Sequence, residues 1–154
     1  MTVFEGLPKP PQGSVVLAPG RVVGVVQGGG KAMYSFAVES VVVDPKCTAT
    51  YAAAAERGHY VALAVVVRTT ADVSPAEGTA PITAYDFAVT GVDGVTETQV
   101  SSTFMCLPEA EYHTTEPYLP SAQYGGVVML DTKSAHGVIE FRPDVTAAGW
   151  EWAF

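Results

Sequence analysis

Short segments in which apolar and polar residues alternate recur along the chain, and proline, glycine, aspartate and serine separate them. This period-two pattern is typical of β-strands, because successive side chains of a strand point to opposite faces of the sheet. Residues 33–43 and 84–90 show the pattern most clearly. The segment 60–68 is apolar at nearly every position, which is typical of a central strand covered on both faces. The chain is therefore expected to form antiparallel sheets.

Further strand-like segments extend this pattern along the whole chain. They are residues 21–26, 95–104, 126–131 and 136–141, and an Asp93-Gly94 turn signal precedes the second of them. Only the alanine-rich segment 49–57, which Gly58 ends, indicates a helix. Because helices do not alternate with strands, a doubly wound parallel sheet is not expected. We predict an all-β antiparallel sandwich of about seven to eight strands with one short helix.

The last residues of the chain predict a further strand. Trp150 and Trp152 share one strand face, and Glu151 lies on the opposite face. Two tryptophans so close to the end of a chain favour docking into the core over a free tail.

The N-terminal residues differ in composition from the rest. Residues 1–14 are rich in proline and glycine and predict an extended tether, so residues 15–154 are expected to form a single domain. No basic segment followed by an apolar one marks a signal peptide. The longest aliphatic run, residues 61–67, is much shorter than the roughly 20 residues of a membrane helix, so no direct membrane insertion is expected.

Composition argues against an intrinsically disordered chain and against a nucleic-acid-binding protein. The chain of 154 residues is 48% hydrophobic, which is too apolar for intrinsic disorder. It carries 8 lysines and arginines against 16 aspartates and glutamates, for a formal net charge of −8. Nucleic-acid binding requires a concentrated basic face, so no nucleic-acid partner is expected.

No motif for catalysis or for a cofactor is present. The glycine-rich segment 27–31 lacks the first glycine and the final hydroxyl residue of a phosphate-binding loop. No serine lies in a nucleophile elbow, and His59, His113 and His136 lie in three different segments, where a solvated histidine is the usual case. We therefore predict a protein that is not an enzyme and that uses no cofactor.

One stretch between strands is rich in acidic and aromatic residues. Its acidic part, Glu109 to Glu116, lacks the spacing of known calcium loops, so a solvated loop is the default, and whether it binds a cation stays open. Tyr112, Tyr118 and Tyr124 lie in the same stretch among prolines. Tyrosines on a loop at the end of a sandwich are typical of binding surfaces, so these three are candidate partner-binding residues. They could equally fold back over the core.

The two cysteines, Cys47 and Cys106, each follow a strand-like segment. They could meet at the rim of a sheet as a disulfide, or remain as two free buried thiols. Spacing alone does not decide between these alternatives. Without a further cysteine or histidine at ligand spacing, a structural zinc site is not expected.

Several short motifs occur in an order that resembles a known family. They are Asp44-Pro45-Lys46-Cys47, Gly58-His59-Tyr60, Asp93-Gly94-Val95, Cys106-Leu107, Gly125-Gly126-Val127 and Gly149-Trp150-Glu151-Trp152. Together they resemble the immunoglobulin-like domain of exported lipoproteins of actinobacterial type. The chain is more distantly similar to small secreted mycobacterial antigens with an immunoglobulin-like fold.

This resemblance implies an immunoglobulin-like sandwich outside the cytoplasm, secreted or anchored to the cell envelope through a removed N-terminal segment. It also implies that Cys47 and Cys106 form a disulfide, and it implies no catalytic residue. The expected function is a non-enzymatic binding module of the bacterial envelope or extracellular space, with a protein or cell-surface partner. The alternative is a structural or decoration protein on a large particle such as a phage virion.

Overall fold

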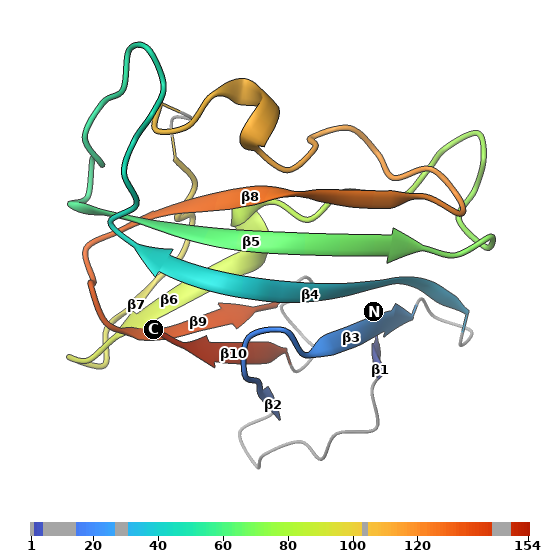
Figure 1. Ribbon diagram of the computed structural model, residues 1–154. Coiled ribbons are helices and arrows are strands. Elements are labelled where there is room, and N and C mark those ends of the chain that lie inside the picture. The colour runs from blue at the N-terminus through green and yellow to red at the C-terminus, as the bar shows by residue number, and fades with distance from the viewer. Residues whose placement is uncertain (1, 5–14, 27–30, 103–104, 143–148) are drawn as a thin grey trace.

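The computed structural model describes residues 2–4, 15–26, 31–102, 105–142 and 149–154. Two five-stranded sheets face one another, as predicted for a β-sandwich (Figure 1). The first sheet has the order β1-β3-β4-β5-β8, with strands Thr2–Phe4, Val22–Val26, Ala32–Val43, His59–Thr69 and Gln123–Thr132. The second has the order β2-β10-β9-β6-β7, with strands Val15–Val16, Trp150–Ala153, Gly137–Phe141, Phe87–Gly91 and Thr96–Glu97.

Strand pairing is antiparallel except between β2 and β10, which pair in parallel. The long strands β4 and β5 form the centre of the first sheet, and their register shifts once between Val38 and Ser40. Valine fills many of their positions, since β-branched side chains pack well on a pleated surface. β8 pairs with β5 along ten residues and ends this sheet.

The core lies between the two sheets and is rich in aromatic rings. Phe36 of β4 packs edge-on against Phe141 of β9 and against Trp150 of β10, with ring centroids 4.8 and 6.0 Å apart. Trp150 and Trp152 are buried, which confirms the predicted docking of the C-terminus as a final strand. Burying a large aromatic side chain contributes on the order of 2–3 kcal/mol.

A second, smaller apolar cluster covers the opposite face of β5 and β8. It contains Tyr60, Ala62, Met129 and Cys106. The prediction that residues 60–68 are covered on both faces therefore holds for the first part of that segment. Farther along β5, Ala64 and Val66 are only half-buried.

Cys47 and Cys106 form a disulfide that spans 59 positions of sequence, as the resemblance implied. Around it, the amide groups of Thr48 and Ala49 donate to the carbonyl of Cys106 over 2.9 and 3.1 Å. The bond thus joins the segment after β4 to the segment before β8, and Cys106 belongs to the apolar cluster on the outer face of the first sheet.

The helix predicted at residues 49–57 is wrong. That segment contains no helix, and its amide groups are used elsewhere: Ala53 donates to the carbonyl of Met105, while Glu56 and Arg57 donate to the carboxylate of Asp131. A helix this short is marginal without packing, so tertiary hydrogen bonds prevail over the propensity of its alanines. Short 3₁₀ helices occur instead at Ala84–Asp86 (η1) and Glu109–Glu111 (η2).

The strand predicted at residues 95–104 is wrong over most of its length. Thr96–Glu97 pairs with β6 in the second sheet, whereas Ser101 bridges to Leu130 in the first sheet. Between them, Gln99 has a left-handed backbone with φ of 54°, which breaks the extended path as the chain crosses between sheets. Phe104 lies outside the described residues.

The N-terminal tether was predicted for residues 1–14. Within it, Thr2–Phe4 pairs with β3 at the edge of the first sheet, so these three residues belong to the sandwich. Residues 5–14, which hold the proline-rich stretch, lie outside the described residues, as does most of the glycine-rich segment 27–31. Among the described residues, no helix has the length and apolar character needed to span a bilayer.

Candidate functional site

A covering loop, residues 105–122, begins over the outer face of the first sheet and runs along the edge of β8 that does not pair with β5 (Figure 1). The disulfide holds the beginning of this loop, and two isolated β-bridges hold its middle. Tyr112 bridges to Val127 of β8, and Tyr118 bridges to Thr79. The loop carries two of the predicted partner-binding tyrosines, and the third, Tyr124, follows it in β8.

Tyr112 and Tyr124 use their hydroxyl groups within the protein. The Tyr112 hydroxyl accepts hydrogen bonds from the amides of Cys106 and Leu107, over 3.3 and 2.9 Å. The Tyr124 hydroxyl accepts one from the amide of Leu119 over 2.9 Å. Both side chains are half-buried, so each holds the loop in shape, and their role in partner binding stays a prediction.

Tyr118 cannot contact a partner as a surface residue, because its side chain is fully buried. Its ring packs against Tyr34 and Tyr124, with centroids 5.6 and 4.9 Å away. Its hydroxyl accepts a hydrogen bond from the amide of Ile82 over 3.0 Å. The sequence left two alternatives for this tyrosine, contact with a partner or folding back over the core. Tyr118 folds back over the core.

His113 is buried next to Tyr118, whereas a solvated histidine was expected from the sequence. Its Nε2 lies 2.5 Å from the hydroxyl of Tyr118. Burial raises the pKa of Tyr118 well above its usual value, so the hydroxyl keeps its proton. Burial lowers the pKa of His113 to about 4, so the imidazole is neutral near neutral pH. We assign the Tyr118 proton to the bond with Nε2, which places the imidazole proton on Nδ1.

A cavity of about 280 Å³ lies beside His113. Its walls come from four separated segments of the chain: η1 and the residues before it, Ser101 and Ser102, residues 113–115 of the covering loop, and residues 127–129 of β8. Sequence reasoning missed this cavity, because these segments become neighbours only when the two sheets pack.

Two acidic residues of the loop, Glu109 and Glu116, line one open pocket together with Tyr112 and His113. Glu109, Glu111 and Glu116 are all exposed. Among the residues that the structure describes, no group of three histidines, cysteines, aspartates or glutamates has an arrangement that could hold a metal ion.

The other histidines lie far from this arrangement in the sequence. The Nδ1 atom of His59 lies 2.9 Å from the carboxylate of Asp44, at the end of the β4–β5 pair, and both side chains are partly exposed. His136 precedes β9 in the second sheet. The three histidines thus remain at three separate places.

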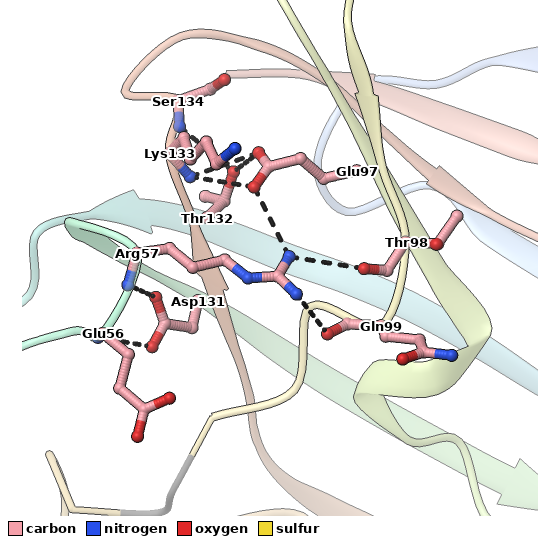
Figure 2. A network of polar contacts seen from close by, with 9 residues as sticks. All are labelled: Glu56, Arg57, Glu97, Thr98, Gln99, Asp131, Thr132, Lys133 and Ser134. Carbon is pink, nitrogen blue, oxygen red and sulfur yellow. Dashed lines mark hydrogen bonds and ion pairs between the residues drawn. The ribbon is translucent and has the colours of Figure 1, made fainter.

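A polar network holds the segment after the disulfide against β8, as Figure 2 shows. The buried carboxylate of Asp131 accepts hydrogen bonds from the amides of Glu56 and Arg57, over 2.8 and 2.9 Å. Sequence reasoning missed this role of Asp131, although a carboxylate at the end of an apolar strand is a signal that a buried partner exists.

The side chain of Arg57 extends the network toward the crossing between sheets. Its guanidinium donates to the carbonyls of Thr98 and Gln99, over 3.3 and 3.2 Å, and pairs with Glu97 at 3.5 Å. Glu97 also accepts a hydrogen bond from the hydroxyl of Thr132. These contacts are structural, since each charged group is satisfied by groups of the protein.

Comparison with known proteins gives one similar fold. No family model matches the chain, and no curated protein matches it in sequence. In fold, the chain is similar to MPT63. MPT63 is described as a secreted protein from Mycobacterium tuberculosis, is 11% identical, and aligns with a TM-score of 0.52 over 92% of this chain and 98% of its own.

At this identity, the similarity to MPT63 establishes the fold. The predicted antiparallel β-sandwich is therefore confirmed. The likeness agrees with the predicted resemblance to small secreted mycobacterial antigens, whereas the resemblance to exported lipoproteins stays a prediction.

Proposed function

We propose that this protein is a non-enzymatic binding module that works outside the cytoplasm, in the bacterial envelope or the extracellular space. The observation that carries the proposal is the disulfide between Cys47 and Cys106. Structural disulfides persist in oxidising compartments and are rare in the cytosol. The secreted nature of MPT63, whose fold is similar, supports the same compartment.

The proposed contact surface lies beside the disulfide. Tyr51 is 83% exposed, and the partly exposed side chain of Met105 lies close to it, since both line one shallow hollow together with Leu107 and Pro108. Exposed tyrosine and methionine are enriched at protein interfaces, because they offer large apolar contact area. We propose that a protein or cell-surface partner binds here, with Tyr51 as the principal contact.

The compartment is tested by fractionating cells of the native organism with thiols blocked by alkylation at the moment of lysis. We expect the protein in the culture medium or envelope fraction, with neither Cys47 nor Cys106 alkylated. Reduced protein confined to the cytosolic fraction would overturn the proposal.

Binding is tested with a photoreactive phenylalanine analogue placed at Tyr51, and at Val92 as the matched control. Val92 is 86% exposed but lies in the turn between β6 and β7, in the second sheet. On intact native cells, we expect a discrete cross-linked product from position 51 and none from position 92. Equal cross-linking at both positions would contradict a specific contact at Tyr51.

A further inference from the structure

Part of the outer face of the first sheet lies beyond the layer formed by the disulfide-linked segments. That layer packs over one end of the face, on the apolar cluster of Tyr60, Ala62, Met129 and Cys106. Farther along the strands, four residues pair with one another in one row across β3, β4, β5 and β8, namely Val22, Ala37, Val66 and Gly125. Their neighbours along the strands, such as Val23, Phe36 and Val65, belong to the core between the sheets. Because successive side chains of a strand alternate, this open row faces outward.

The open row presents an apolar surface with small side chains. Val22, Ala37 and Val66 line a hollow of about 400 Å³. Gly125 adds no side chain, so the face of another sheet can approach this row closely. Val22 is 49% exposed, and covering it with a second apolar surface removes that area from water.

Two residues of opposite charge, Arg68 and Glu39, lie on opposite sides of the open row and line the same hollow. Arg68 pairs with Ser35, which precedes Ala37 by two residues on β4, whereas Glu39 follows Ala37 by two residues. At roughly 3.3 Å per residue, the two charged positions are about 13 Å apart along the strands. Both residues are exposed, and neither has an ion-pair partner among the residues that the structure describes. The open row thus has a positive end and a negative end.

We propose that two copies of this chain pair through the open row, with the strands of one copy antiparallel to those of the other. The twofold axis lies between the two facing sheets and runs along the row, so it exchanges the two ends of the strands. Arg68 of each copy then lies opposite Glu39 of the other copy, and the apolar side chains of the two rows meet between these charges. One surface is therefore complementary to itself, as a twofold interface requires.

The layer over the other end of the sheet favours the same arrangement. It covers Tyr60 and Ala62 near the start of β5, whereas Arg68 lies near the end of that strand. With antiparallel strands, the layer of each copy lies beyond the open end of the other copy. With parallel strands, the two layers would meet and like charges would lie at the same end. The open row is separate from the hollow beside Tyr51, so this pairing does not depend on the proposed function.

Self-association is tested by sedimentation equilibrium of the full chain from about 1 μM to about 1 mM. The buffer contains about 0.15 M salt, which screens the formal charge of −8 on each copy. We expect a monomer–dimer equilibrium without larger species, because a twofold interface closes on itself. In NMR spectra, the amide resonances of residues 22–24, 35–39 and 64–68 should shift with concentration, whereas those of the turn between β6 and β7 should not.

Charge reversal tests how the two copies are arranged. R68E and E39R each place like charges opposite one another, and each contact occurs twice in the dimer. We therefore expect the association constant of the dimer to fall at least about tenfold in both variants. The double variant R68E/E39R restores opposite charges and should restore the wild-type constant. K133E makes the same change of charge at an exposed lysine that follows β8, and it should leave the constant nearly unchanged.

The same variants distinguish this contact from an effect of net charge. R68E makes the chain more acidic and E39R makes it less acidic, so general repulsion between copies would change in opposite directions. The wild-type measurements decide the question if a variant does not fold. A wild type that stays monomeric at the highest concentration, single variants that associate as tightly as the wild type, or a double variant as weak as the single ones would each overturn the proposal.

Discussion

At the residue scale, His113 shows how burial changes the role of a side chain. From the sequence, a histidine within an acidic loop was expected to be solvated, but the structure places it against Tyr118 with 5% of its surface exposed. Because the charged imidazolium would lose its hydration there, burial lowers the pKa of His113 from 6.5 to about 4. A shift of this size links the stability of the fold to pH.

The sign of this linkage follows from proton binding. Between about pH 6.5 and pH 4 the unfolded chain binds a proton at His113 and the folded chain does not, so the free energy of unfolding falls as the pH falls through this interval. In H113Q this contribution is absent, while the glutamine carbonyl can still accept the Tyr118 proton. From about pH 7 to about pH 5, the wild type should lose roughly 2 kcal/mol more than H113Q, measured by urea unfolding.

The comparison with H113Q cancels the contributions of other groups. Burial raises the pKa of Asp86, which favours the folded state in acid and so opposes the effect of His113, but Asp86 is present in both proteins. Parallel pH profiles for the two proteins would contradict a buried, neutral His113.

At the element scale, the fold depends on how closely the covering loop approaches β8. The amide of His113 donates to the carbonyl of Val127 over 2.9 Å, and this contact brings the loop backbone against Gly126. A Cβ atom at Gly126 would lie 2.6 Å from the backbone nitrogen of His113, and the φ of 156° is unfavourable for other residues. Glycine at this position is therefore a condition for the loop to pack.

The adjacent glycine offers a matched control. At Gly125 the nearest atom to an added Cβ is the carbonyl oxygen of Val65, at 3.9 Å, which is ordinary contact. We expect G126A to lower the free energy of unfolding by about 1–3 kcal/mol and to increase amide exchange across residues 109–116. G125A should have a much smaller effect on both. Denaturant unfolding and hydrogen exchange measure both, and similar losses in the two variants would refute a close approach specific to Gly126.

At the scale of the whole molecule, the disulfide connects parts that strand pairing leaves separate. It joins the segment after β4 to the segment before β8, across 59 positions of sequence. The network of Asp131 and Arg57 then holds the first of these segments against β8 and the crossing between sheets (Figure 2). Together with the bridge between Tyr112 and Val127, the disulfide and the polar network hold the layer that covers the outer face.

The energetic weight of the disulfide can be measured directly. By the chain-entropy estimate, closing a loop of this length stabilises the folded state by roughly 4 kcal/mol. Adding a reductant to the wild type should lower the midpoint of urea unfolding by a corresponding amount. The C47A/C106A variant should already have the lower midpoint and should not respond to the reductant. A wild-type midpoint that is insensitive to reduction would contradict a stabilising role.

The sequence by itself determined the longer strands of both sheets, but it did not predict the short strands β1 and β2, and its prediction for residues 95–104 was wrong. The alternating segment 33–43 forms β4, the apolar segment 60–68 forms β5, and the terminal tryptophans lie in β10. A period of two places every second side chain on the same face, and this holds whichever strand lies alongside. These are local properties, and local chemistry suffices for them.

Only the tertiary structure decided the segments whose partners are distant in sequence. Residues 49–57 have the composition of a helix, yet Asp131 and Met105 take their amide hydrogen bonds. The segment 95–104 changes sheets at Gln99, and His113 becomes buried because the covering loop folds onto β8. In each case the free energy comes from contacts between residues far apart in the chain, which a short sequence window does not contain.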